Sequence, residues 1–207
     1  MATPSTSDIL KHADDSVAVQ QTVNRRNKPL PLDISEPLAN WPSDYERLRQ
    51  RIAAALPPAT ILLMQHIGST SVPNLPAKAV IDMDLVVPDS SNEATYAPAL
   101  EAAGLQFLAR EPSWFEHRVF GAEDPVANIH VWGPNAPEVV RHRAMRDWLT
   151  KSAEDRELYA RVKREASAAT LAEAGHMGQY NDRKAKVLRQ ILDRALNDAG
   201  YMKETVI

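Results

Sequence analysis

Cysteine is absent from the 207 residues of this sequence. Its absence excludes a disulfide scaffold, a thiolate zinc site, a cysteine nucleophile and an iron–sulfur cluster, and it fits a reducing compartment. Apolar runs are short as well: none reaches the roughly 18 residues of a transmembrane helix, and residues 1–15 lack the basic start and apolar middle of a signal peptide. These absences predict a cytoplasmic protein without a membrane partner, in which carboxylates and histidines would carry the chemistry.

An excess of positive charge is also missing, because the formal net charge is −3. We therefore do not expect nucleic acid as a partner. The charge is unevenly distributed, since residues 141–194 hold 13 of the 24 Lys and Arg but 8 of the 27 Asp and Glu. This basic segment could face an anionic ligand or the acidic part of its own chain.

Hydrophobic periodicity predicts both helices and strands. A capping box of Ser43 with Glu46 is expected to start the first helix, and the pair Pro57-Pro58 would end it. A short helix at 93–103 and three helices after Pro137 are expected as well. Apolar or β-branched runs predict strands at 61–65, 80–87, 106–109, 113–120 and 127–132, of which the last two could form a hairpin.

The order of these elements is not a regular βαβ series, so we expect an α+β core with a C-terminal helical layer. The length is that of one domain. We predict a single domain over 41–198, made of a sheet core in 41–136 and a helical layer in 137–198. An N-terminal tail or arm in 1–40 precedes it, and a C-terminal tail in 199–207 follows it. The oligomeric state stays open.

Two carboxylates interrupt the apolar strand expected at 80–87. Asp82 and Asp84 are two residues apart, so both side chains lie on the same face of that strand. Like charges side by side on a central strand are costly unless something positive offsets them. A divalent metal such as Mg²⁺ would do this, and so would salt bridges to Arg or Lys on a neighbouring element.

A turn of small residues beginning at Gly68 follows the strand expected at 61–65. Glycine lets the backbone approach a ligand closely. The amides and hydroxyls of Ser69, Thr70 and Ser71 could donate hydrogen bonds to phosphate oxygens. By itself, such a turn usually connects two elements and binds no ligand. Together with the Asp-x-Asp pair, whose first member Asp82 lies 14 residues after Gly68, it predicts one site for a triphosphate and its metal.

This combination of a Gly-Ser turn with an Asp-x-Asp strand resembles the core motif of the nucleotidyltransferase (polymerase β-like) superfamily. The longer string HIGSTSVPNLPAKAVIDMD, from residue 66 to residue 84, resembles the GrpB family, whose pattern is H-x-G-S-T-[AS]-V-P-G-L-x-A-K-P-x-I-D-I. Supporting matches continue through the helical region, including Tyr159-Ala-x-x-Lys163. The resemblance implies a nucleotidyltransferase-like fold with a mixed sheet flanked by helices. It also implies a nucleoside triphosphate substrate, with Mg²⁺ or Mn²⁺.

The chain departs from the family pattern at Asn74, where Gly is usual, and at Ala79, where Pro is usual. Asparagine tolerates a left-handed turn, so the shape of the loop can persist. The superfamily also uses a third carboxylate on a neighbouring strand, and here His130 occupies the corresponding place. His130 could be a base, a metal ligand or a structural residue, and Glu116 is the competing third acid.

Several cations could complete this site. Lys78 lies between the small-residue turn and the aspartate strand, where it could neutralise phosphate charge. Arg118 is two residues from Glu116 on the same expected strand face, and Lys184 lies in the basic segment. For Arg118 and Lys184 the alternative is a solvated or salt-bridged side chain. For His66 we expect a hydrogen bond to the turn.

Three functions therefore compete. The first is an Mg²⁺-dependent nucleotidyltransferase that moves a nucleoside monophosphate from a nucleoside triphosphate to a small-molecule or protein acceptor. The second is a non-catalytic module that binds a nucleotide or another phosphorylated metabolite, which the histidine at position 130 would favour. The third is a different enzyme built on the same fold.

Overall fold

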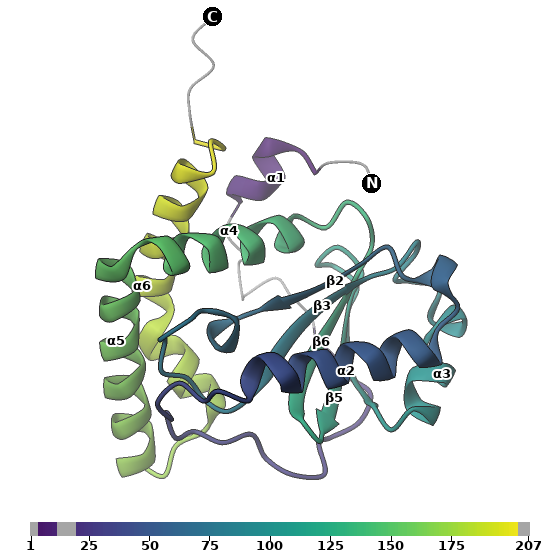
Figure 1. Cartoon of the computed structure of the whole chain (residues 1–207), viewed down its shortest axis with the longest axis horizontal. Helices are drawn as coiled ribbons and strands as arrows, with labels where there is room; N and C mark the ends of the chain where they lie inside the picture. The colour runs from purple at the N-terminus through teal and green to yellow at the C-terminus, as the bar shows by residue number, and fades with distance from the viewer. Residues whose placement is uncertain (1–3, 12–19, 203–207) are drawn as a thin grey trace, which may run out of the picture.

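The structure is a computed structural model that describes residues 4–11 and 20–202 (Figure 1). Parts of both expected tails, residues 1–3, 12–19 and 203–207, lie outside the described residues. The strands are β1 (Gln21–Thr22), β2 (Leu63–Ile67), β3 (Ile81–Val86), β4 (Gln106–Glu111), β5 (His117–Glu123) and β6 (Val126–Trp132). The helices are α1 (Thr6–Leu10), α2 (Trp41–Ala55), α3 (Ala97–Ala102), α4 (Pro137–Lys151), α5 (Ala153–Ala172) and α6 (Met177–Asp198). Short 3₁₀ turns are η1 (Pro58–Thr60), η2 (Ser69–Ser71) and η3 (Glu93–Thr95).

The strands form one mixed sheet in the order β1-β4-β5-β6-β3-β2. β3 and β6 run parallel, and the other neighbouring strands are antiparallel. Helices α2 and α3 cover one face, whereas α4 lies over the other and α6 and α5 pack beside it (Figure 1). The expected α+β class with a mixed sheet and a helical layer is thereby confirmed. No helix in the described part of the chain is long and apolar enough to cross a membrane.

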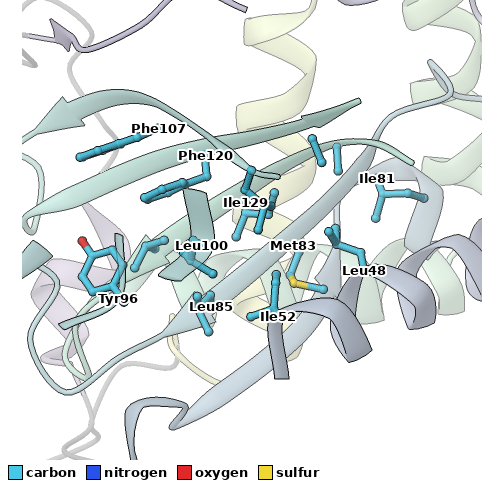
Figure 2. Close-up of a cluster of buried hydrophobic side chains, with 14 of the residues drawn as sticks. Leu48, Ile52, Ile81, Met83, Leu85, Tyr96, Leu100, Phe107, Phe120 and Ile129 are labelled. Atoms are coloured by element: carbon cyan, nitrogen blue, oxygen red, sulfur yellow. The ribbon is translucent and has the colours of Figure 1, made fainter. Parts of the chain in front are cut away.

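Alternation along β3 decides which side chains face each layer. Met83 and Leu85 are buried in the main core, where they face Ile52 of α2 (Figure 2). Because successive side chains of a strand point to opposite faces, Asp82 and Asp84 turn together toward the α4 face. The predicted common face of the two aspartates is therefore present.

Helix α2 begins three residues before the expected start. Its N-cap is Asn40, which makes no side-chain cap hydrogen bond, and Pro42 stands in the first turn. Ser43 Oγ instead donates to the Asn40 carbonyl at 2.8 Å. The predicted capping box of Ser43 with Glu46 is thus wrong. A proline suits the first helical turn because its φ is already helical and its missing N–H would have no partner there.

Strands β2 and β5 begin later than expected. The η1 turn extends its hydrogen bonding to the amide of Ile61, so the chain becomes extended only after it. Before β5, Phe115 and Glu116 have φ of 50° and 53°, which places them in a turn and makes His117 the first strand residue. The predicted hairpin of β5 with β6 is confirmed by their antiparallel ladder.

The expected N-terminal arm is attached to the domain at several points. In α1, Ile9 is buried against α4 and α6, and Arg141 Nε donates to its carbonyl at 2.8 Å. Strand β1 pairs with the edge strand β4. Further along, Arg26 donates to Asn128 Oδ1 of β6. The described part of the arm therefore belongs to the packed structure.

Candidate functional site

A cavity of about 650 Å³ lies on the face of the sheet opposite α2. Its size is within the range of small-molecule sites, roughly 300–1,000 Å³. Strands β3, β5 and β6 supply one side, and α4, α5, α6 and the η2 turn supply the other. Of the site residues predicted from the sequence, those that line the cavity are Gly68, Ser69, Thr70, Lys78, Asp82, His130 and Lys184, and those that do not are Asp84, Glu116 and Arg118.

Asp82 and the Gly68 turn are in direct contact at the cavity. Asp82 Oδ1 accepts a hydrogen bond from Asn128 Nδ2 at 2.7 Å. A Cβ added to Gly68 would stand 2.5 Å from Asp82 Oδ2, and Gly68 has φ 68° and ψ −172°, a region that only glycine adopts readily. Burial raises the pKa of Asp82, and the Asn128 hydrogen bond and the charges of Lys78 and Lys184 oppose this rise. Glycine thus permits the turn to lie against the carboxylate.

Replacing Gly68 by alanine is expected to lower the free energy of unfolding by about 2–4 kcal/mol, because a strained φ and an overlap with Asp82 must both be relieved. Gly104→Ala is the matched control, since Gly104 has φ 82° but no atom within 4 Å of the added Cβ. It should cost only about 1–2 kcal/mol. Urea unfolding compares the two variants, and equal losses would show that the contact with Asp82 does not constrain the turn.

Asp84 is fully buried and does not line the cavity. It accepts hydrogen bonds from Gln65 Nε2 at 2.8 Å and Trp132 Nε1 at 2.9 Å, and His142 Nδ1 lies 3.0 Å from its Oδ1. Burial alone would raise the pKa of Asp84, but the charge and hydrogen bond of His142 outweigh it and lower this pKa. The same pairing overcomes burial at His142 and raises its pKa to about 9. An ion pair with His142 therefore offsets the charge of Asp84.

The donors present do not fit a resident metal held between Asp82 and Asp84. No group of three or more His, Asp or Glu side chains able to hold a metal ion occurs within residues 4–11 and 20–202. The oxygens of Asp84 are taken by its three donors. A Mg²⁺ that arrives with a polyphosphate needs only one or two protein carboxylates. Asp82 alone fits that role.

The hydroxyls of the η2 turn are partly engaged within the protein. Thr70 Oγ1 donates to the Val80 carbonyl at 3.2 Å and lies 3.0 Å from His66 Nε2. Ser71 Oγ donates to the carbonyl three residues earlier at 2.6 Å. The expected bond from His66 to the turn is thus present, and the Thr70 hydroxyl serves the turn itself. Ser69, which lines the cavity, is the better placed hydroxyl for a ligand.

Three lysines from different elements meet at the helical side of the cavity. The ammonium groups of Lys78 and Lys184 lie 4.8 and 5.0 Å from the ring centre of Tyr180. Lys163 of α5 is 1% exposed, and its Nζ donates to the Pro76 carbonyl. Burial, reinforced by neighbouring positive charges, lowers the pKa of Lys78 to about 8 and that of Lys163 to about 6. An anion placed among these lysines would relieve their mutual repulsion.

His130 faces the same cavity from β6. Its ring is parallel to that of His117 at 5.2 Å and lies 5.9 Å from that of His142. His117 in turn stacks on Trp132 at 3.8 Å. Burial, followed by the charges of His117 and His142, lowers the pKa of His130 to about 3. The imidazole of His130 is therefore neutral at pH 7 and can accept a proton.

The prediction that Glu116 and Arg118 flank the site does not hold. Glu116 lies in the turn before β5, and its Oε2 accepts from Arg118 Nη1 at 3.0 Å. Arg118 shares the face of Phe120, where its Nε donates to Glu93 at 2.7 Å on the α3 side of the sheet. Side chains alternate along β5, so Arg118 on the α3 side leaves His117 and Val119 to face the cavity.

The cavity residues that the sequence reasoning missed include four with titratable side chains: Glu111, His117, His142 and Lys163. A signal existed for His117, because it lies in the predicted hairpin that also holds His130. Lys163 lies in one of the supporting family matches. His142 had no local signal, since its role depends on where α4 meets β3.

Comparison with known proteins gives consistent matches. A family model described as GrpB protein matches residues 31–194. A UPF0157 protein of Halalkalibacterium halodurans is 43% identical over 155 residues, which cover 75% of this chain and 77% of that protein. A UPF0157 protein of Streptomyces coelicolor is 37% identical over 166 residues, which cover 80% of this chain and 85% of that protein. The crystal structure of the conserved protein GrpB from Enterococcus faecalis aligns with a TM-score of 0.68 at 23% identity, over 81% of this chain and 99% of that chain. At that identity the structural likeness concerns the fold alone.

Proposed function

The chain belongs to the GrpB family, and from this premise we propose that its cavity binds a phosphorylated small molecule of about the size of a nucleotide. The observation that carries the proposal is the meeting of Lys78, Lys163 and Lys184 at one cavity. Such like charges are unfavourable beside one another unless a ligand supplies negative charge. Phosphate is the anion for which several lysines on one wall are suited.

The other charged groups of the cavity support an anionic ligand. Arg146 adds positive charge to that of the lysines, against the carboxylates Asp82 and Glu111, whereas the charge of His142 is balanced by Asp84. Since the pKa of Lys163 is lowered to about 6, this amine is mostly neutral at pH 7 when no anion lies beside it. An anion beside it would raise that pKa again, so binding should take up a proton.

Titration calorimetry tests the proposal with inorganic phosphate, pyrophosphate and the four ribonucleoside triphosphates, with adenosine as the phosphate-free comparison. Lys78→Ala and Lys184→Ala should each weaken binding of a triphosphate by about tenfold or more, the effect of one lost charge-assisted contact. Lys186→Ala, an exposed lysine two residues from Lys184 on the same helix, should leave affinity unchanged. Binding that is equal in all three variants, or no binding of any phosphate compound, would refute the proposal.

Nucleotidyl transfer is the second candidate function, and the contact of Asp82 with the Gly68 turn favours it. In this function the lysines and Ser69 hold the polyphosphate, and Asp82 is the carboxylate available to a Mg²⁺ that arrives with the substrate. An acceptor hydroxyl or amine would then attack the α-phosphate. Pyrophosphate release that depends on Asp82, lost in Asp82→Asn, distinguishes transfer from binding alone.

A further inference from the structure

Three side chains on adjacent strands form a continuous hydrogen-bond chain that ends at the cavity. Glu111 of β4 stands opposite His117 of β5 in the ladder, and Glu111 Oε2 lies 2.8 Å from His117 Nδ1. His117 Nε2 lies 3.0 Å from His130 Nδ1 on β6. All three residues line the cavity. The chain therefore runs from a carboxylate through two imidazoles without a break.

The carboxylate at one end of this chain fixes the proton on the Nδ1 of His117, and the charge of His117 decides the proton at His130. A carboxylate can only accept, so His117 Nδ1 carries the proton that bonds Glu111. With His117 neutral, its Nε2 carries a lone pair that accepts from the Nδ1–H of His130, whereas a protonated His117 would donate at that position. A neutral His130 with its proton on Nδ1 keeps a lone pair on Nε2, the ring nitrogen that remains for a ligand.

Stacking makes this arrangement rigid. His117 is 5% exposed and lies flat against Trp132, with ring centres 3.8 Å apart and planes 11° from parallel. The ring of His130 is nearly parallel to that of His117, at an interplanar angle of 13°. On its other side His142 is fixed by Asp84. The orientation of His130 is thus set by its neighbours before any substrate binds.

We propose that Glu111, His117 and His130 form a hydrogen-bond relay in which His130 Nε2 is the general base of the reaction at this cavity. His130 is the catalytic residue, and Glu111 and His117 are positioning residues that act through it. The substrates, by class, are a nucleoside triphosphate and an acceptor that bears a hydroxyl group, water included. The relay rests on the transfer activity given above as the second candidate function.

The acceptor O–H bond breaks as its proton passes to His130 Nε2, and the acceptor oxygen forms a bond to the α-phosphorus. The bond from the α-phosphorus to the bridging oxygen breaks, and pyrophosphate leaves with that electron pair. Burial and the neighbouring histidines lower the pKa of His130 to about 3, so the imidazolium formed there needs negative charge beside it. The bound triphosphate supplies that charge directly, and Glu111 adds to it through His117.

Nuclear magnetic resonance of ¹⁵N-histidine-labelled protein tests the relay without any ligand. In the wild type, the ring nitrogen shifts should show His117 and His130 each protonated on Nδ1 and unprotonated on Nε2. Glu111→Gln should disturb this pattern at both rings, because an amide can donate as well as accept. A wild-type His130 protonated on Nε2 would overturn the proposal.

Pyrophosphate release from each Mg²⁺–ribonucleoside triphosphate, with water as the acceptor, tests the same relay in action. His130→Gln should lower kcat by about 10²- to 10⁴-fold, the range of a lost general base. Glu111→Gln should lower kcat by a smaller factor, and calorimetric affinity for the triphosphate should change by less than about threefold in both variants. Glu116→Gln, a nearby carboxylate outside the cavity, is the matched control and should keep the wild-type rate.

The possible outcomes distinguish a failure of the relay from a failure of nucleotidyl transfer itself. An unchanged kcat in His130→Gln refutes the relay and leaves nucleotidyl transfer standing. Failure of the wild type to bind any triphosphate, or binding without pyrophosphate release, refutes the transfer activity and the relay with it. A loss of kcat in Glu116→Gln equal to that in Glu111→Gln would show that the effect is not specific to the hydrogen-bond chain.

Discussion

Replacing His142 by glutamine is expected to lower the free energy of unfolding by about 3 kcal/mol at pH 6, because it removes the charged partner of a fully buried carboxylate. Asp84 is 0% exposed and His142 is its only ionic partner among the described residues. Glutamine keeps a neutral donor in place, so the loss reports mainly on the charge. Chemical unfolding at pH 6 measures it.

The pH dependence of this loss follows from the two pKa shifts. The pKa of His142 rises from 6.5 to about 9 on folding, so its contribution is fully present below pH 6.5 and disappears as pH rises toward 9. The pKa of Asp84 is lowered on folding, so its contribution is lost as pH falls through the acidic range. The difference between wild type and His142→Gln should therefore shrink to less than about 1 kcal/mol at pH 9.5.

Subtracting the variant from the wild type at each pH removes the titration of groups that do not interact with His142. His176→Asn is a suitable control, because His176 is exposed and asparagine retains an N-cap acceptor for α6. It should cost under about 1 kcal/mol. A His142→Gln loss that is the same at pH 6 and pH 9.5 would contradict the charged state assigned to His142.

Lys163→Met should act in the opposite direction and stabilise the protein by about 4 kcal/mol at pH 7. Lys163 is 1% exposed, and burial followed by neighbouring positive charges lowers its pKa to about 6. Each unit of such a shift is worth about 1.4 kcal/mol, from which the lost hydrogen bond to Pro76 subtracts about 1 kcal/mol. The same variant should weaken the binding of pyrophosphate and abolish the associated proton uptake.

The stability difference between wild type and Lys163→Met depends on pH, because Lys163 releases its proton at a lower pH in the folded protein than in the unfolded chain. Between pH 6 and 10.5 the unfolded chain holds a proton on Lys163 that the folded protein has released, so wild-type stability rises with pH relative to the variant. The advantage of Lys163→Met should thus fade as the pH approaches 10.5. Lys186→Met, on the exposed side of α6, should change stability by no more than about 0.5 kcal/mol. A Lys163→Met variant less stable than wild type at pH 7 would contradict the burial argument.

The sequence alone determined the local features of the site. The spacing of Asp82 and Asp84 fixed their common strand face, because strand side chains alternate with a period of two. The need for glycine at residue 68 and the tolerance of Asn74 for a left-handed turn follow from backbone sterics. Both are observed, with φ of 68° at Gly68 and 61° at Asn74.

The ends of helices and strands were predicted less accurately, because single prolines and turn residues override the hydrophobic periodicity of the sequence. Pro42 moved the start of α2, and the positive φ of Phe115 and Glu116 delayed β5. The delay at β5 had the larger consequence. It placed Glu116 in a turn instead of on the strand, and the pairing of β5 within the sheet, which the sequence did not fix, put His117 and not Arg118 on the cavity face.

Only the tertiary structure decided how the residues of the site are partnered. Asp82 and Asp84 are equivalent in the sequence pattern, yet one lines the cavity and the other is held by His142 from a helix more than fifty residues later. In the same way, Lys78, Lys163 and Lys184 come together through the packing of α5 and α6 beside the sheet. Alternation and turn geometry are local properties of the chain. Burial, and the charges that shift each pKa, depend on which distant elements pack together.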